Sequence, residues 1–563
     1  RLQVNNQLLP IDEYPRDYYS TDDWTDRAIQ SVKDLRASSA TKPFFLYLAH
    51  NAVHAPLQSK PEDLAKYHGR YDGGWTQARA ERHRRQLELG VIPPGTRLAV
   101  SDARVPLWDD TDPADRPLFA RHMETYAAML DCVDQNLGRL VAFLAALGEL
   151  DNTVLIFSSD NGGTDAGGPT GMFNNNRRYM GLEPQSMQSE RARVADLGGP
   201  RSASLYPTAW GEVCNTPFPS FKTYTGGGGR RVSFLISWPA RIRDHGAVRR
   251  QFVHVTDIMP TVLDLAGVAP LDTINGQPAK RMHGKSFTRV LDDAEAPAPR
   301  SEQYYECWAN RAYYRSGWLA RSIQKRGHPI DLDNWTLHHL DEDFSESIDV
   351  RAQHPEKLEE LVAAFDEAAW ENLVYPLDNR DRVQKFADVS DSERVAADES
   401  RTFLPGTQTT HRADVFPLIS DRSFHLGVRF TLDADDEGVL WAIGDPIGGM
   451  VMFIEGGKLH FHYNGFGDAT TLPGFDVAPG DHEARLEYEA LGDRQGRGRI
   501  MLDDIEQVGW SALSPTLTFG VFEGLDVGID RRGPVLWDLY ERHGAFGYSG
   551  TIHEVRVEPR ARA

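Results

Sequence analysis

The sequence predicts an α/β fold in its first part, a small α+β subdomain after it, and an all-β sandwich or jelly roll at the end. Short apolar runs alternate with helical periodicity over residues 1–300, which is the pattern of a mostly parallel sheet sandwiched by helices. Residues 301–387 are mixed and contain an amphipathic helix near 355–373. Strand-like runs at a spacing of roughly ten residues fill 411–563, as in sandwiches and jelly rolls.

The first domain is predicted from three apolar runs and one long helix. The runs at 44–49, 153–159 and 232–238 are continuous, as expected of strands that are covered on both faces. Residues 117–147 repeat apolar side chains at helical spacing, starting at a proline and ending before a glycine. Because this helix lies between two predicted strands, we expect a right-handed parallel crossover.

The last domain is predicted from evenly spaced strands. A polar stretch, residues 388–410, is predicted to be the linker that leads into it. Gly456 and Gly457 supply a hairpin turn between two of the strands. The strands are predicted at Phe424–Leu432, Val439–Ile443, Met450–Ile454, Lys458–Tyr463, His482–Tyr488 and Gly498–Leu502.

Composition excludes several classes of protein. The 563 residues include 61 Lys and Arg against 82 Asp and Glu, a formal net charge of −21, which argues against a broad nucleic-acid-binding surface. No apolar run has the length that a membrane span needs, and 3 cysteines do not form a disulfide scaffold. The chain begins at Arg1 without a visible signal peptide. Location is therefore left open, with the cytoplasm slightly favoured over the periplasm or secretion.

A pair of oxygen ligands follows the second predicted strand. Asp160 and Asn161 stand in the run Ser-Asp-Asn-Gly-Gly directly after that strand. Ligands bind beyond the carboxyl ends of strands in open α/β sheets, and adjacent carboxylate and amide oxygens suit a hard cation such as Ca²⁺ or Mg²⁺. The alternative is a simple turn after a strand.

Two further segments carry groups that can meet an anion. His54 follows the first predicted strand and precedes Ala-Pro, so its backbone is extended; its ring could donate a proton or hold an anion. Lys222 precedes four glycines and Arg230-Arg231, an arrangement that could grip a tetrahedral anion. The alternatives are a polar loop histidine and a solvated basic loop. A fourth segment, in which Asp257 caps a helix, is predicted to be structural.

In this order the segments resemble the sulfatase family of the alkaline-phosphatase superfamily, with the arylsulfatase branch the most similar. The order is His54-Ala-Pro, Ser-Asp-Asn-Gly, Asn-Thr-Pro-Phe with Lys222, Thr-Asp-Ile-Met-Pro-Thr, and His283-Gly-Lys-Ser-Phe, over about residues 15–375. The resemblance implies an alkaline-phosphatase-like fold with Asp160 and Asn161 as Ca²⁺ ligands. It also implies that His54 and Lys222 contact the sulfate group and neutralise or protonate the oxygen that leaves.

The sequence departs from the family at its nucleophile. Sulfatases use a formylglycine made from Cys or Ser in a Cys/Ser-x-Pro-Ser-Arg motif, which this sequence lacks. It also lacks the paired aspartates at a strand end and the Lys-x-His segment. We expect all three upstream of Arg1, with a formylglycine-generating enzyme as a maturation partner. In addition, Gly226-Gly227 stands where the family usually has His-Glu.

One cysteine imitates the missing motif. Cys307 begins a loose Cys-x-Ala-x-Arg pattern, but it lies after the predicted core and no Thr-Gly-Arg follows. We predict that it is not the nucleophile.

The function predicted is therefore a sulfuric ester hydrolase of the arylsulfatase type that hydrolyses a small-molecule or glycan sulfate ester with the help of calcium. The chain as given is predicted to be catalytically incomplete. One alternative is a phosphonate or phosphodiester hydrolase of the same superfamily. The other is a non-catalytic glycan-binding protein that acts through a lectin-like sandwich. No nucleic-acid partner and no membrane span are expected, and the oligomeric state is left open.

Overall fold

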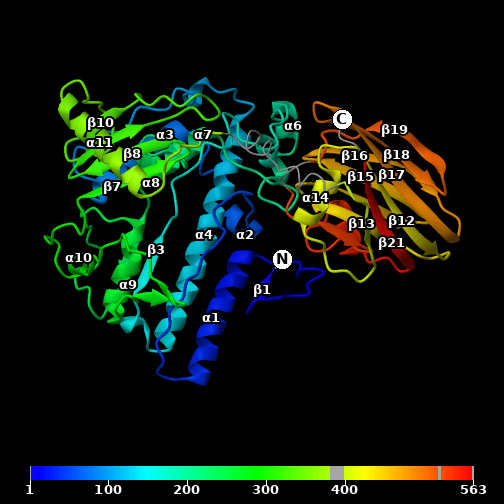
Figure 1. The fold of residues 1–563 in the computed structure, drawn as a ribbon, viewed down its shortest axis with the longest axis horizontal. Helices are drawn as coiled ribbons and strands as arrows, with labels where there is room; N and C mark the ends of the chain where they lie inside the picture. Colours follow the sequence, from blue (N-terminus) through cyan, green and yellow to red (C-terminus); the bar gives the residue numbers. More distant parts are fainter. Residues whose placement is uncertain (1, 381–397, 518–520, 561–563) are drawn as a thin grey trace.

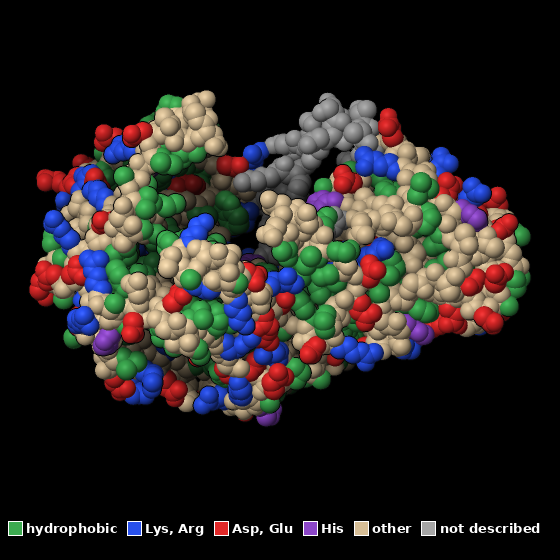
Figure 2. All heavy atoms as spheres, turned by 90° about the horizontal axis from the view of Figure 1, so that it is seen from below, with side chains coloured by type: hydrophobic (Ala, Val, Ile, Leu, Met, Phe, Trp, Pro, Cys, Tyr) green, Lys and Arg blue, Asp and Glu red, His purple; other side chains and the backbone are tan. Residues whose placement is uncertain are grey.

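The computed structural model describes residues 2–380, 398–517 and 521–560. Figure 1 shows two lobes, one built from the N-terminal elements and a small sheet, the other a β-sandwich, with the long helix α4 (Arg116–Ala146) in the first lobe. No helix in these ranges combines the length and the apolar composition needed to cross a membrane. On the face in Figure 2, cationic and acidic side chains are interspersed rather than gathered by sign.

Helices are the main regular elements of the first lobe. The helix predicted at 117–147 is confirmed as α4, and it packs against α1 and α2. The other helices are α1 (Ser20–Ser38), α2 (Pro61–Ala65), α3 (Gly74–Glu88), α5 (Asn176–Tyr179), α6 (Met187–Ala192), α7 (Thr208–Cys214), α8 (Gly227–Arg230), α9 (Ile258–Ala266) and α10 (Thr288–Asp292).

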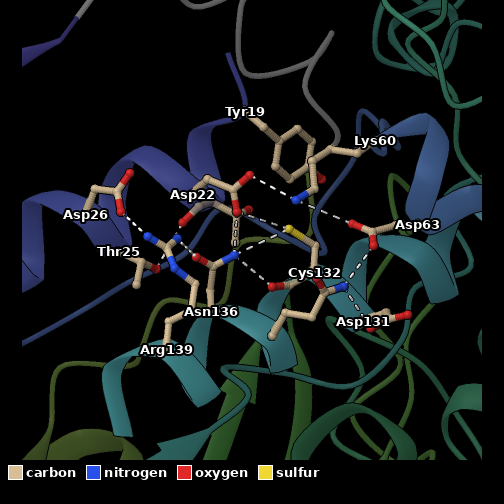
Figure 3. A network of polar contacts seen from close by, with 12 residues as sticks. Tyr19, Asp22, Thr25, Asp26, Lys60, Asp63, Asp131, Cys132, Asn136 and Arg139 are labelled. Atoms are coloured by element: carbon tan, nitrogen blue, oxygen red, sulfur yellow. Dashed lines mark hydrogen bonds and ion pairs between the residues drawn. The ribbon is translucent and has the colours of Figure 1, made fainter. Parts of the chain in front are cut away.

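A polar network joins α1, α4 and the start of α2 (Figure 3). Asp22 accepts hydrogen bonds from Asn136 Nδ2 at 2.6 Å and from Lys60 Nζ at 3.0 Å. Cys132 is buried beside them with its Sγ 3.7 Å from Asp22 Oδ1. Burial raises the pKa of the Cys132 thiol to about 11. This cysteine is therefore an inert part of the helix interface.

The mostly parallel sheet predicted for residues 1–300 is wrong for the described residues. The strands predicted at 153–159 and 232–238 exist as β3 (Leu155–Ser158) and β4 (Phe234–Ser237), but they pair antiparallel in a two-stranded sheet. The short pairs β1 (Gln3–Val4) with β2 (Gln7–Leu8) and β5 (Thr273–Ile274) with β6 (Gln277–Pro278) are antiparallel too. The parallel crossover that we expected on both sides of α4 is absent from these ranges.

The predicted parallel crossover is missing from the described residues because the apolar run at 44–49, its expected first strand, is not a strand. None of the described strands pairs with it, and the side chains of Phe45 and Tyr47 are 77% and 82% exposed. A continuous apolar run becomes a buried strand only when neighbouring strands take up its backbone groups and helices cover its faces. Without such a neighbour, the predicted first strand of the crossover stays an extended surface segment.

A four-stranded antiparallel sheet follows the first lobe's helices. Its order is β10-β9-β8-β7, and the predicted helix near 355–373 is confirmed as α11 (Pro355–Glu371), whose apolar side packs on this sheet. The strands are β7 (Glu302–Cys307), β8 (Asn310–Arg315), β9 (Trp318–Ser322) and β10 (Thr336–His339).

The second lobe consists of two antiparallel sheets that share one apolar core. The orders are β11-β21-β12-β17-β18-β19 and β16-β15-β14-β13-β20. All six strands predicted in 411–563 lie within these sheets. Their bounds are β11 (Arg401–Phe403), β12 (Phe424–Leu432), β13 (Gly438–Asp445), β14 (Gly448–Glu455), β15 (Lys458–Gly465), β16 (Asp468–Asp476), β17 (Gly480–Gly492), β18 (Gln495–Leu502), β19 (Ile505–Ala512), β20 (Leu525–Val527) and β21 (Thr551–Pro559).

Local chemistry explains several of these elements. Gly456 and Gly457, predicted to form a turn, join β14 to β15 with φ of 60° and 71°. β13 and β14 are buried on both faces because helix α15 (Trp537–His543) covers their outer side, and α14 (Arg412–Ile419) adds apolar side chains to the main core. The predicted linker 388–410 lies partly outside the described residues, and β11 falls within it and pairs with β21. The domain boundaries stay predictions.

A docking segment, residues 164–206, connects the two lobes. Met180 is part of the sandwich core, and Arg177 Nη1 lies 2.7 Å from Asp468 Oδ2. Gln185 Nε2 donates to Asp468 Oδ1 at 2.9 Å. A cavity of about 500 Å³ lies at this junction, between Leu182 and the turn at Arg494. It is not lined by any of the four predicted site residues.

Candidate functional site

The structure brings two of the predicted site loops together. Asp160 and Asn161 follow β3, and the Ser159 N–H donates to Ser233 O at 3.3 Å, so the loop leaves the sheet beside β4. The Lys222 N–H donates to Gly163 O at 2.9 Å. The backbone that carries Lys222 therefore lies against the end of the Asp160–Gly163 loop.

Asn215 holds the two loops in this arrangement. Its Oδ1 accepts from the Gly163 N–H at 2.6 Å, and its Nδ2 donates to Gly163 O and Ser220 O, both at 3.0 Å. The side chain is buried, so these bonds are not exchanged with water. We did not assign Asn215 a role from the sequence. Its only local signal is a short amide side chain at the end of a helix, in the Asn-Thr-Pro segment.

The glycine run packs beneath both loops. A Cβ on Gly162 would lie 1.7 Å from Gly228 O, and a Cβ on Gly228 would lie 2.2 Å from Ser220 O. The Gly162 N–H also donates to Gly229 O at 3.2 Å. Only glycine permits this approach of backbone to backbone. The alternative for this stretch was a solvated basic loop, but the glycines form the short buried helix α8.

The two arginines after the glycines are not free to bind an anion. Arg230 Nη2 lies 2.5 Å from an oxygen of the buried Glu346. Arg231 lies over the rings of Phe344 and Phe218, at 4.3 and 5.2 Å, and burial lowers its pKa to about 10. Lys222 is half-buried, and its ammonium forms no ion pair within the described ranges. Of the cations in this stretch, Lys222 is the one left to meet an anion.

His54 lies in an exposed loop. Its Nδ1 is 2.7 Å from the carbonyl oxygen of Ala55, and the loop continues to Leu57, which bonds to Ser204 in the docking segment. In the part of the chain that the structure describes, no hydrogen bond or ion pair joins His54 to Asp160, Asn161 or Lys222. That His54 shares their site stays a prediction.

The residues present supply only part of a metal site. Asp160 is exposed, and Asn161 donates its Nδ2 to Gly162 O at 3.0 Å, with no described donor on its Oδ1. Ca²⁺ takes about six to eight oxygen ligands. Over residues 2–380, 398–517 and 521–560, no group of three or more His, Cys, Asp or Glu side chains is placed to hold a metal ion. The described residues therefore do not complete a calcium site.

Cys307 lies nearer to this site than the sequence suggested. It ends β7, and the hairpin tip docks on the Lys222 loop because Asn310 Nδ2 donates to Thr223 O at 3.0 Å. Burial, reinforced by Glu306, raises the pKa of the Cys307 thiol. A raised pKa disfavours direct attack by a Cys307 thiolate. That Cys307 is not the formylglycine precursor stays a prediction.

Asp257 is buried and structural, but its side chain does not cap α9 as predicted. It stands at the N-cap position without a side-chain bond to that helix, and it accepts hydrogen bonds from the N–H groups of His254 and Lys285, both at 2.8 Å. Arg300 pairs with it at 2.5 Å, and both side chains are buried. Asp257 thus joins the Thr-Asp-Ile segment to the His-Gly-Lys segment, far from Asp160 in the sequence.

Comparison with known proteins matches residues 2–268 to the sulfatase family and residues 227–374 to the C-terminal region of N-sulphoglucosamine sulphohydrolase. Residues 2–268, a little under half of the chain, are thus similar to the sulfatase family. The match agrees with the predicted resemblance over this region, and the roles of the individual site residues stay predictions.

Several relatives are sulfatases by name. An uncharacterized sulfatase of Schizosaccharomyces pombe is 30% identical over 63% of this chain and 62% of its own length. An arylsulfatase of Klebsiella aerogenes is 29% identical over 49% of this chain and 57% of its own. The chain thus spans less than two thirds of these relatives. The crystal structure of Ps i-CgsB aligns with a TM-score of 0.40 at 21% identity, over 64% of this chain and 57% of that one.

Proposed function

We propose that the protein is a sulfuric ester hydrolase of the arylsulfatase type that acts with calcium. The observation that carries the proposal is the placement of Lys222. Asn215 fixes its loop beside the Asp160–Gly163 loop, and the Lys222 ammonium has no carboxylate partner in the described ranges. A half-buried cation without a counter-ion attracts an anion, and a sulfate ester carries one at the oxygens next to the bond that breaks.

The roles of the two basic side chains follow from their chemistry. The Lys222 ammonium is a compact point charge with three donors, suited to the sulfate oxygens. The His54 imidazole is exposed and carries a ring N–H, so it would deliver a proton to the oxygen that leaves on S–O cleavage. In this proposal both groups assist a reaction that a nucleophile begins.

Asp160 and Asn161 are proposed to supply two ligands of a Ca²⁺ ion. Bound calcium polarises sulfate oxygens as a Lewis acid. The described residues leave most of its coordination shell unfilled, so we expect only weak Ca²⁺ binding by this chain. Because the formylglycine motif is absent from the 563 residues, we also expect no turnover of an aryl sulfate by this chain, even when it is coexpressed with a formylglycine-generating enzyme. Turnover that Cys307→Ala abolished would overturn that expectation.

Binding of inorganic sulfate tests the Lys222 assignment without requiring turnover. Lys222→Met should weaken sulfate binding at least tenfold in isothermal titration, because it removes the unpaired cation and keeps the length of the side chain. Lys42→Met, on the loop after α1, is the matched control and should change nothing. Equal sulfate affinity in the two variants would refute the role of Lys222.

Calcium titration tests the Asp160 assignment in the same chain. Asp160→Ala should abolish the weak Ca²⁺ binding, since it removes the carboxylate of the pair, while Asp151→Ala, another exposed aspartate of the same lobe, should preserve it. Circular dichroism confirms that both variants keep the fold. Unchanged Ca²⁺ affinity in Asp160→Ala would contradict the metal proposal.

A further inference from the structure

The glycine turn of α8 is the common support of the two site loops. On one side Gly162 contacts it, and on the other the Gly228 N–H donates to Pro219 O at 2.8 Å, three residues before Lys222. A Cβ on Gly229 would lie 2.2 Å from Tyr224 O, so the turn is closely packed on the Lys222 side as well. A shift of this turn by a few tenths of an ångström would move both loops, because no flexible side chain lies between the backbones.

A single carboxylate holds this turn from below. Glu346 is completely buried, and its Oε2 accepts from the Gly227 N–H at 3.0 Å. Its two oxygens also pair with Arg230 Nη2 at 2.5 Å and Arg321 Nη1 at 2.8 Å. Arg321 belongs to β9, so Glu346 connects the small four-stranded sheet to a turn about 120 residues earlier in the chain.

The charge balance makes this carboxylate hard to replace. Burial opposes its ionisation, but Arg230 and Arg321 hold the pKa of Glu346 below its usual value, so it is ionised at neutral pH. Arg231 lies nearby with only aromatic rings against its guanidinium. Within the described residues, Glu346 is thus the carboxylate that pairs with both Arg230 and Arg321. Removing its charge would leave buried guanidinium groups uncompensated and the turn without its anchor.

We propose that Glu346 is a positioning residue of the sulfate site: by fixing the glycine turn, it sets the Asp160–Asn161 loop at its working separation from Lys222. The inference rests on the proposed function for what the site binds, but the positioning itself is a property of the fold. It assigns to the small sheet region a part in building a site whose other residues all precede residue 230.

Amide hydrogen exchange in the full chain tests the positioning. Glu346→Gln keeps the shape of the side chain but removes its charge. We expect the amides of Gly162, Gly163 and Lys222 to exchange at least tenfold faster. The Gly162 acceptor, Gly229 O, lies in the turn, and the other two acceptors, Asn215 Oδ1 and Gly163 O, join the loops that the turn supports. The matched control is Asp257→Asn, another buried carboxylate that pairs with an arginine and accepts from backbone N–H groups. At temperatures equally far below their melting points, the control should leave those three amides unchanged.

Sulfate titration adds a functional readout. Glu346→Gln should weaken sulfate binding at least tenfold, and Asp257→Asn should not weaken it. If the unmodified chain binds no sulfate, the proposed function fails while the exchange rates still decide the positioning. Equal exchange rates of the three amides in Glu346→Gln and Asp257→Asn would overturn the positioning role of Glu346. Should Glu346→Gln not fold, Arg321→Met, which keeps the Arg230–Glu346 pair, must show the same selective acceleration to a smaller degree, and its absence would refute the proposal.

Discussion

Similar apolar runs are buried in one lobe and exposed in the other. In the sandwich, β13 and β14 are continuous apolar runs that are buried on both faces, one face against the opposite sheet and the other against α15. In the first lobe, the equally apolar run at 44–49 has no described strand beside it and leaves Phe45 and Tyr47 in solvent. Apolar sequence alone therefore does not bury a strand; a partner on each side does.

The largest expected effect concerns the independence of the lobes. Among the described residues, the sandwich core takes Met180 and Ala203, with Leu182 packed against it, from outside residues 398–563. We therefore expect residues 398–563, expressed alone, to unfold in one cooperative calorimetric transition. Residues 1–380 alone should bind a hydrophobic dye and aggregate, because exposed strand backbone and apolar surface invite association. A sandwich fragment without a calorimetric transition would show that the docking segment is needed for its folding.

A matched pair of substitutions measures the same contrast at single residues. Phe430 is fully buried between the sheets and Phe45 is largely exposed. Phe430→Ala should lower the free energy of unfolding of the sandwich by about 3–5 kcal/mol, and Phe45→Ala should change that of the first lobe by less than about 0.5 kcal/mol. Urea denaturation of the full chain, followed lobe by lobe with hydrogen exchange, gives both values. A large loss for Phe45→Ala would show that the 44–49 segment is covered.

The smallest expected effect is a difference in acid sensitivity. Burial lowers the pKa of His122, in the first lobe, to about 3, and both its ring nitrogens lack hydrogen-bond partners in the described residues. As pH falls below about 6.5, His122 binds a proton in the unfolded chain but not in the folded lobe, so the folded lobe loses stability. In the sandwich, burial likewise lowers the pKa of His462, to about 4, but it raises that of Asp445 to about 6, and folding then favours proton uptake by Asp445 over the same range.

We therefore expect the melting temperature of the first lobe to fall more steeply than that of the sandwich between pH 6.5 and 4. Scanning calorimetry across this range measures both slopes. His122→Leu should flatten the slope of the first lobe, because it removes one of the buried histidines whose pKa burial lowers. If both lobes lost the same number of degrees and His122→Leu changed neither slope, the assigned origin of the acid sensitivity would be wrong.

Features that depend on local periodicity were predictable from the sequence. The helix expected at 117–147 is α4, Arg116–Ala146, because its apolar spacing repeats over many turns. The six strands expected in the sandwich are present for the same reason. The strand at 44–49 was wrong because pairing is a property of a distant segment, which no local pattern records. The parallel sheet failed with it, since β3 and β4 pair with each other instead.

In the site, too, the local motifs were predictable and the long-range contacts were not. The order of the motifs predicted that Asp160, Asn161 and Lys222 belong together, and the backbone bond from Lys222 to Gly163 places their loops side by side. Asn215 and Glu346 were missed. Each acts on backbone or arginine groups that only folding brings near, and Glu346 lies in an acidic stretch that resembles a solvated turn in the sequence.

The docking segment also determines how the site is connected mechanically. It begins directly after Gly163, and the chain that follows it continues through α7 to Asn215, whose buried amide bonds back to Gly163. Its middle is fixed on the sandwich by Met180 and by the Arg177–Asp468 ion pair. A force that pulls the lobes apart would therefore travel along covalent backbone to Asn215 and load the two ends of the segment together. The docking segment thus links the sandwich to the site loops through a closed stretch of backbone.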